Sequence, residues 1–101
     1  MNTILHGPAN LFKGYEAVGG MLTLTSDRLE FKPHVMNIQR QEETIELADI
    51  ERVEKSNTLG LIPNAVKVIT ADGEFRFVVL NRKRWIEKIR HEIELLTAQP
   101  A

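Results

Sequence analysis

Cysteine is absent from the 101 residues of this chain. Its absence excludes a disulfide framework, thiol nucleophiles and cysteine-ligated zinc sites. Long apolar runs are missing as well, because no stretch approaches the roughly 20 residues that a membrane-crossing helix needs. Residues 1–11 also lack the basic segment followed by an apolar run that marks a secretory signal. We therefore expect a cytoplasmic protein.

A strong excess of charge is missing too. The chain has 13 Lys and Arg residues against 14 Asp and Glu residues, which gives a formal net charge of −1. Domains that bind nucleic acids are usually basic. We therefore expect no nucleic-acid partner, and any site for an anion must be a local patch.

Signatures of catalysis and metal binding are also absent. The chain has no G-x-S-x-G elbow, no phosphate-binding P-loop and no Rossmann glycine pattern. Its histidines, His6, His34 and His91, have no second ligand at the spacing of a metal site. Glu87 precedes His91 by four residues, but such a pair is more often a surface contact. We expect a protein that is not an enzyme and holds no metal or cofactor.

What is present is the composition of a globular domain, with 43% hydrophobic and 27% charged residues. A chain of this length can bury one core without metal or disulfide support. We expect residues 1–101 to form a single domain. Within it, residues 1–9 are predicted to be a loose lead-in and residues 97–101 a tail.

Residues 21–32 predict a β-hairpin around a tight connection at Ser26–Asp27. Apolar side chains occupy alternate positions in both arms, so each arm has one apolar face. Gly19–Gly20 predicts the turn that leads into this hairpin, after a weaker strand over 10–17. A hairpin cannot bury its apolar face alone, so we expect a larger antiparallel sheet around it.

A second hairpin is predicted over residues 65–79. It turns at Asp72–Gly73, a pair that tolerates the positive φ of a tight turn. Alternation also predicts strands over 44–47 and 50–55, and residues 56–64 are predicted to be a loop. The pattern therefore predicts about seven short antiparallel strands.

The periodicity changes from two residues to that of a helix near the C-terminus. We expect Asn81 to be the N-cap of a helix, because its side-chain oxygen can accept a hydrogen bond from the first turn. Apolar residues then recur at helical spacing over about four turns. We expect this amphipathic helix to cover the open end of the sheet with one stripe: Trp85, Ile86, Ile89, Ile93 and Leu96.

Three segments together resemble the GRAM domain. They are Gly-Gly-x-Leu-x-Leu-Thr-x-x-Arg-Leu-x-Phe over 19–31, Ile-Glu-Leu-x-Asp-Ile-x-x-Val over 45–53, and Thr-x-Asp-Gly-x-Phe-x-Phe over 70–77. The resemblance extends from about Leu11 to Ile89. It implies the pleckstrin-homology-like superfold, a barrel or sandwich of two packed antiparallel sheets with seven strands and a C-terminal helix. It also implies a module that binds phosphoinositides or other proteins.

The segment 32–40 between the third and fourth strands is the first candidate site. Its cations are Lys32, Arg40 and, when protonated, His34, and Lys13 is the nearest further cation. Cations around insertable apolar groups suit an anionic membrane surface. The resemblance also implies a head-group site near this loop.

Two features oppose a lipid site. The strand over 21–25 has no basic residue where phosphoinositide-binding relatives commonly carry one or two, and Glu16 would repel a phosphate. Val35, Met36 and Ile38 can insert into a membrane or pack on the sheet as a strand extension. We favour packing on the sheet.

The segment 56–64 is the second candidate site, because Leu59, Leu61 and Ile62 make it unusually apolar for a loop. These side chains can cover an open end of the sheet or form an exposed patch for a partner. We favour covering the core, since a small domain has little apolar area to spare.

The cations of residues 82–84, at the start of the helix, are a third feature. Cations there oppose the helix dipole. An anionic partner would explain them, as would a well-solvated face, which we favour.

Two functions remain after these exclusions. The first is docking of a protein partner or of a second copy, through exposed strand edges and the loop around Leu59, Leu61 and Ile62. The alternative is binding of an anionic lipid head group at a membrane surface, through Lys32, Arg40 and Lys13. The lack of basic residues over 21–25 favours the first.

Overall fold

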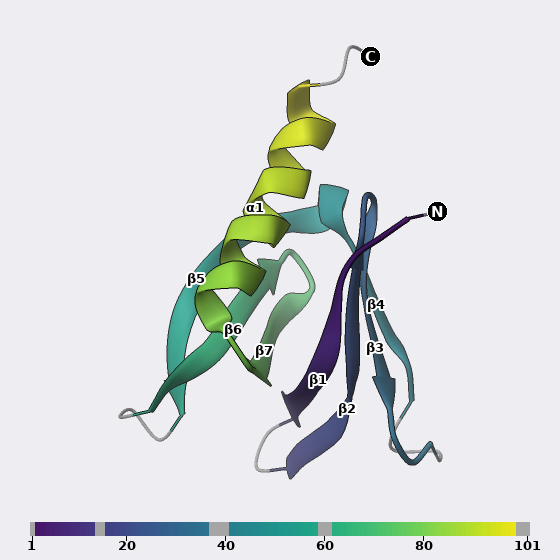
Figure 1. The fold of residues 1–101 in the computed structure, drawn as a ribbon, viewed down its shortest axis with the longest axis vertical. Coiled ribbons are helices and arrows are strands. Elements are labelled where there is room, and N and C mark those ends of the chain that lie inside the picture. Colours follow the sequence, from purple (N-terminus) through teal and green to yellow (C-terminus); the bar gives the residue numbers. More distant parts are fainter. Residues whose placement is uncertain (1, 14–15, 37–40, 59–61, 99–101) are drawn as a thin grey trace.

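The computed structural model describes residues 2–13, 16–36, 41–58 and 62–98. These residues form strands, one short 3₁₀ helix and one α-helix (Figure 1). In chain order the elements are β1 (Thr3–Lys13), β2 (Glu16–Thr25), β3 (Arg28–Pro33), β4 (Glu43–Glu46), η1 (Leu47–Asp49), β5 (Ile50–Thr58), β6 (Ile62–Thr70), β7 (Gly73–Val79) and α1 (Arg82–Ala98).

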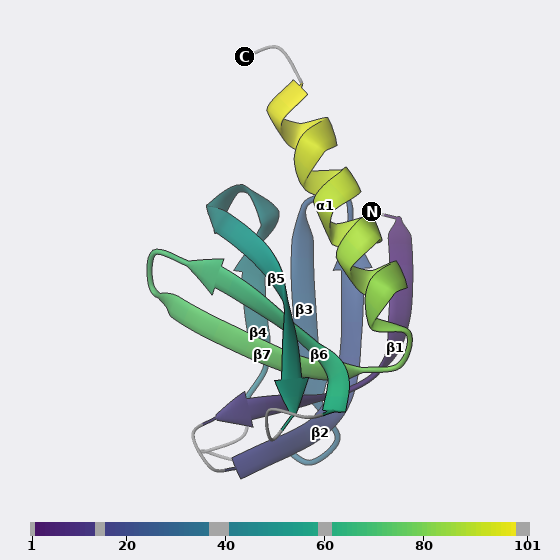
Figure 2. The same ribbon diagram turned by 90° about the vertical axis from the view of Figure 1, so that its left-hand side faces the viewer.

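The seven strands belong to one antiparallel sheet in the order β4-β3-β2-β1-β7-β6-β5. β1 joins the two halves of this sheet. It pairs with β2 over nearly its whole length, and Ala9–Phe12 also pair with β7. Figures 1 and 2 show the two halves as limbs that run in different directions, β1–β4 and β5–β7. This architecture confirms the prediction of seven antiparallel strands with a C-terminal helix.

Inward-facing positions of the strands fill the space between the limbs. In the first hairpin Leu22, Leu24, Leu29 and Phe31 are each at most 1% exposed, as their alternation predicted. Phe31 meets Phe77 of β7 with 5.9 Å between the ring centroids. Burial of each such side chain contributes about 1.5–3 kcal/mol, so these positions hold the two limbs together.

α1 packs against both limbs and contacts β1, β5, β6, β7 and η1. Its stripe is buried at Trp85, Ile86 and Ile89, as helical spacing predicted. Asn81 caps the helix, because its Oδ1 accepts a hydrogen bond from the backbone nitrogen of Arg84 at 3.4 Å. The predicted N-cap and the predicted covering role of the helix are therefore both confirmed.

The lead-in predicted for residues 1–9 is wrong, because β1 already begins at Thr3. The predicted turn at Gly19–Gly20 is also wrong, since both glycines lie inside β2. A Cβ on Gly20 would stand 2.3 Å from the backbone oxygen of Lys32. Gly20 is therefore needed for close approach of β3, and not for chain reversal.

Other element ends differ from prediction by a few residues. The second hairpin turns at Ala71–Asp72 rather than Asp72–Gly73, with Gly73 opposite Thr70. Gly73 does have the positive φ expected of it, 138°. β5 extends to Thr58 and β6 begins at Ile62, so the predicted loop over 56–64 is largely strand. The helix continues to Ala98, into the predicted tail.

Candidate functional site

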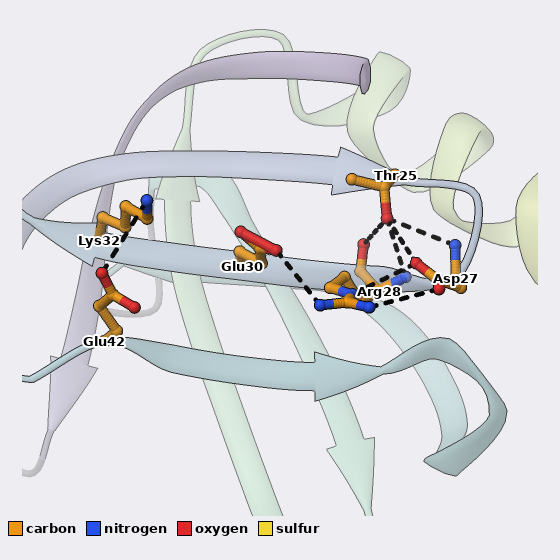
Figure 3. Close-up of polar contacts among 6 residues, drawn as sticks. All are labelled: Thr25, Asp27, Arg28, Glu30, Lys32 and Glu42. Carbon is orange, nitrogen blue, oxygen red and sulfur yellow. Dashed lines mark hydrogen bonds and ion pairs between the residues drawn. The ribbon is translucent and has the colours of Figure 1, made fainter. Parts of the chain in front are cut away.

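A cluster of polar side chains closes the β2–β3 turn (Figure 3). The Thr25 hydroxyl donates to Asp27 Oδ1 at 2.9 Å and accepts from the Arg28 backbone nitrogen at 3.1 Å. Hydrogen bonds from the Arg28 guanidinium and from Thr25 hold the pKa of Asp27 below its usual value. The Asp27 carbonyl accepts a bond from the Leu47 backbone nitrogen at 3.0 Å. This cluster fixes a turn and the start of η1, so its role is structural.

Of the predicted lipid-binding cations, the structure describes the side chains of Lys32 and His34. Lys32 is exposed, and its Nζ lies 3.9 Å from Glu42 Oε1 (Figure 3). His34 is also exposed, and its backbone nitrogen donates to the Gly19 carbonyl at 3.0 Å. The side chain of Lys13 and the whole of Arg40 lie outside the described residues. The Lys32 charge is therefore partly neutralised before any lipid approaches.

Val35 and Met36 follow β3 directly, and each side chain is 61% exposed. The prediction that they pack on the sheet is therefore wrong; Ile38 lies outside the described residues. At the end of β3 the described cations, Lys32 and His34, and the described apolar residues, Val35 and Met36, therefore all face the solvent.

Ile62 is the first residue of β6, and it is 49% exposed. The prediction that it covers the core is wrong. Leu59 and Leu61 lie outside the described residues, so their predicted role stays a prediction. Figure 1 shows the start of β6 and the end of β3 at the same end of the molecule.

Leu80, between β7 and α1, is 73% exposed and was missed in the sequence. The alternation of β7 could have indicated this exposure. Phe77 and Val79 are buried, so the side chain at position 80 must point to the opposite face. A leucine in that outward position is an apolar side chain without a place in the core.

An open groove of about 400 Å³ is lined by two of these residues, His34 and Leu80. We call it the Gly19 groove, and its lining includes Pro8, Asn10, Gly19, His34, Asn64 and Leu80. Strand register builds it: Asn10 of β1 is opposite both Gly19 of β2 and Val78 of β7. A Cβ on Gly19 would stand 3.2 Å from Asn10 Oδ1 and 3.7 Å from His34 Cδ2. Glycine therefore keeps the space between Asn10 and His34 open.

Within the described ranges, no three His, Asp or Glu side chains are grouped so that they could hold a metal ion. Within the same ranges, α1 has neither the length nor the apolar composition of a membrane-crossing helix.

Comparison with known proteins places this geometry among related folds. The family model described as "GRAM domain" matches residues 8–94. A comparison with curated proteins finds no match.

Solved structures with the same fold are distant in sequence. The C-terminal domain of an unknown protein from Leishmania infantum has a TM-score of 0.79 and 18% identity, covering 91% of this chain and 84% of that one. The N-terminal pleckstrin-homology domain of human ARAP2 has a TM-score of 0.74 and 14% identity, with coverage of 96% and 84%. The DH/PH domains of PDZ-RhoGEF, solved in complex with activated RhoA, have a TM-score of 0.74 and 13% identity, with coverage of 91% and 29%.

Proposed function

Since the chain belongs to the GRAM domain family, a family of pleckstrin-homology-like binding modules, we propose that it is a docking module for another protein chain. Domains of this kind are generally binding modules without catalytic activity. The docking surface we propose consists of the Gly19 groove together with Ile62, Val35 and Met36. Its occupant is a protein segment that presents apolar side chains.

One observation carries this proposal: large apolar side chains stay exposed around the groove. Leu80 lies on its border at 73% exposure, while Val35 and Met36 follow the lining residue His34. Single exposed apolar residues are common on protein surfaces, but several around one groove indicate a contact site. A partner that covers them would gain about 25 cal/mol for each Å² of apolar surface removed from water.

The charges around the groove favour a protein over a lipid head group. Lys32 already faces Glu42 at 3.9 Å, so the positive potential at the end of β3 is reduced. No basic residue lies over 21–25. A neutral, apolar partner surface fits such a site better than a polyanion does.

Leu80→Asp tests the proposal, because it places a charge in the expected contact without touching the core. Leu95→Asp is the matched control, since Leu95 is also exposed (46%) but lies near the C-terminal end of α1. Sedimentation velocity over a range of concentrations measures self-association. A photo-crosslinking residue placed at position 80 or 95, followed by mass spectrometry, reports a different partner.

We expect association or crosslinking to depend on position 80 and not on position 95. Equal behaviour of the two positions, with both variants folded, would contradict docking at the groove. Loss of folding in Leu80→Asp alone would show that Leu80 covers the core in solution.

A second candidate function is peripheral binding to an anionic membrane, which the exposed Val35–Met36 pair beside Lys32 and His34 favours. Such a site combines apolar insertion with about 1 kcal/mol for each basic residue. Flotation with phosphatidylserine vesicles and with neutral vesicles tests it. Lys32→Ala combined with Arg40→Ala should weaken binding, most at low salt, where screening is weakest. Equal binding to anionic and neutral vesicles, unchanged by the double substitution, would exclude this candidate.

A further inference from the structure

A second cavity, of about 400 Å³, lies between β5 and the first half of α1, and it shares no lining residue with the Gly19 groove. We call it the basic cavity, because four cations and one carboxylate line it. The lining residues are Lys55 of β5 and Arg82, Lys83, Ile86, Glu87 and Arg90 of α1. These cations come from a strand and from the first and third turns of a helix, and the fold brings them to one place.

The two arginines of the basic cavity are held in position by the edge of the sheet. Arg82 Nη1 donates to the Ser56 carbonyl at 2.9 Å, and Arg90 Nη2 donates to the Val53 carbonyl at 2.6 Å. A guanidinium has five N–H donors, so each arginine keeps donors beyond those bonds. Side chains that are already ordered lose little entropy when a ligand binds.

The cations of the basic cavity outnumber its one carboxylate, Glu87. The ion pairs found in the described part of the chain involve none of Lys55, Arg82, Lys83 and Arg90. The first turn of α1 contains no acidic residue, although that end of a helix favours anions. Four cations around one carboxylate, in a chain of net charge −1, create a local positive potential that an anion would relieve.

Along α1, the basic cavity adjoins another cavity whose lining has more acidic than basic residues. The adjoining cavity shares Arg90, but its other charged residues include Glu51, Glu54 and Glu94. An extended acidic peptide along this side would meet those carboxylates. A compact anion confined to the basic cavity would not.

We propose that the basic cavity binds a compact phosphate-bearing anion, either free in solution or as the head group of a lipid. Arginine forks match phosphate oxygens in pairs, and the two lysines add mobile charge. The cavity volume is in the range of small-ligand sites. This site shares no lining residue with the Gly19 groove. It also differs from the candidate lipid segment, whose first residues end β3 on the other limb (Figure 1).

Lys55→Glu and Lys83→Glu test the basic cavity, since both side chains are exposed and neither is bonded to the sheet. Arg84→Glu is the matched control: it makes the same charge change next to Lys83 but does not line the cavity. Lys83→Glu and Arg84→Glu both favour the helix dipole, so a loss of binding cannot be assigned to a weaker helix.

Isothermal titration with inositol hexakisphosphate and with pyrophosphate measures the free anion. Flotation with vesicles that contain phosphatidylinositol 4,5-bisphosphate measures the head group. We expect each lysine variant to bind about tenfold more weakly, as loss of one charged hydrogen bond implies. Arg84→Glu should change affinity by about twofold or less.

Binding of the soluble anions that depends on Lys55 and Lys83 would support a free phosphate ligand. The same dependence with vesicles alone would support a head group. Three results would overturn the proposal: no binding of any probe, equal loss in the Arg84→Glu control, or preferential binding of poly-glutamate. Lys55→Ala and Lys83→Ala repeat the comparison if a reversed charge lowers the melting temperature.

Discussion

The two ends of the interior between the limbs differ in whether their apolar side chains are covered. At one, α1 buries Trp85, Ile86 and Ile89 against both limbs. At the other, where β3 ends and β6 begins, Met36 and Ile62 remain exposed (Figure 1). Apolar side chains are therefore stabilising where a helix covers them, and available to a partner where the described chain leaves them uncovered.

The covered end should respond most strongly to mutation. Trp85→Ala should lower the free energy of unfolding by about 3–5 kcal/mol and Ile89→Ala by about 2–5 kcal/mol, because each leaves a cavity in the core. Leu95→Ala, on the exposed side of the same helix, should change it by about 0.5 kcal/mol or less. Urea titration measures all three. Similar stabilities would mean that α1 does not close the sheet.

A substitution at Gly20 tests the close approach of β3 to β2. Gly20→Ala should cost about 1–3 kcal/mol, because its Cβ would meet the Lys32 backbone oxygen at 2.3 Å. Gly19→Ala meets Asn10 Oδ1 at 3.2 Å, and that side chain can move, so the cost should be about 0.5 kcal/mol or less. Thermal melts of the two variants separate the cases. An equal cost would show that close approach of β3 is not what requires glycine.

Gly73 tests a backbone effect at the β6–β7 turn. A Cβ there would contact nothing within 4 Å, so the cost of Gly73→Val comes from its φ of 138°. We expect about 1–3 kcal/mol. Ala71→Val, in the same turn but without a positive φ, should cost much less. Equal midpoints in denaturant titrations of these two variants would contradict the conformation of the turn.

The smallest effects are expected at the uncovered end. Leu80→Ser and Met36→Ser should each change the free energy of unfolding by about 0.5 kcal/mol or less, because both side chains are mostly in water. Urea titration alongside Ile89→Ala gives the comparison. A loss as large as that of Ile89→Ala would place these side chains in the core and remove the contrast between the ends.

The candidate surfaces could be predicted only in part. Lys32, His34 and Ile62 were singled out from the sequence, and all three are exposed. The Gly19 groove was not foreseen, since it depends on β1 lying between β2 and β7. That pairing joins segments far apart in the sequence, and no local pattern encodes it.

The sequence by itself determined the local elements, because side-chain periodicity and turn chemistry act over a few residues. Alternation around Ser26–Asp27 and helical spacing after Asn81 were enough to identify the first hairpin and α1. The tertiary structure decided which apolar residues are covered. Val35 and Ile89 are both apolar, yet one is 61% exposed and the other 1%, because burial depends on neighbours that distant segments supply.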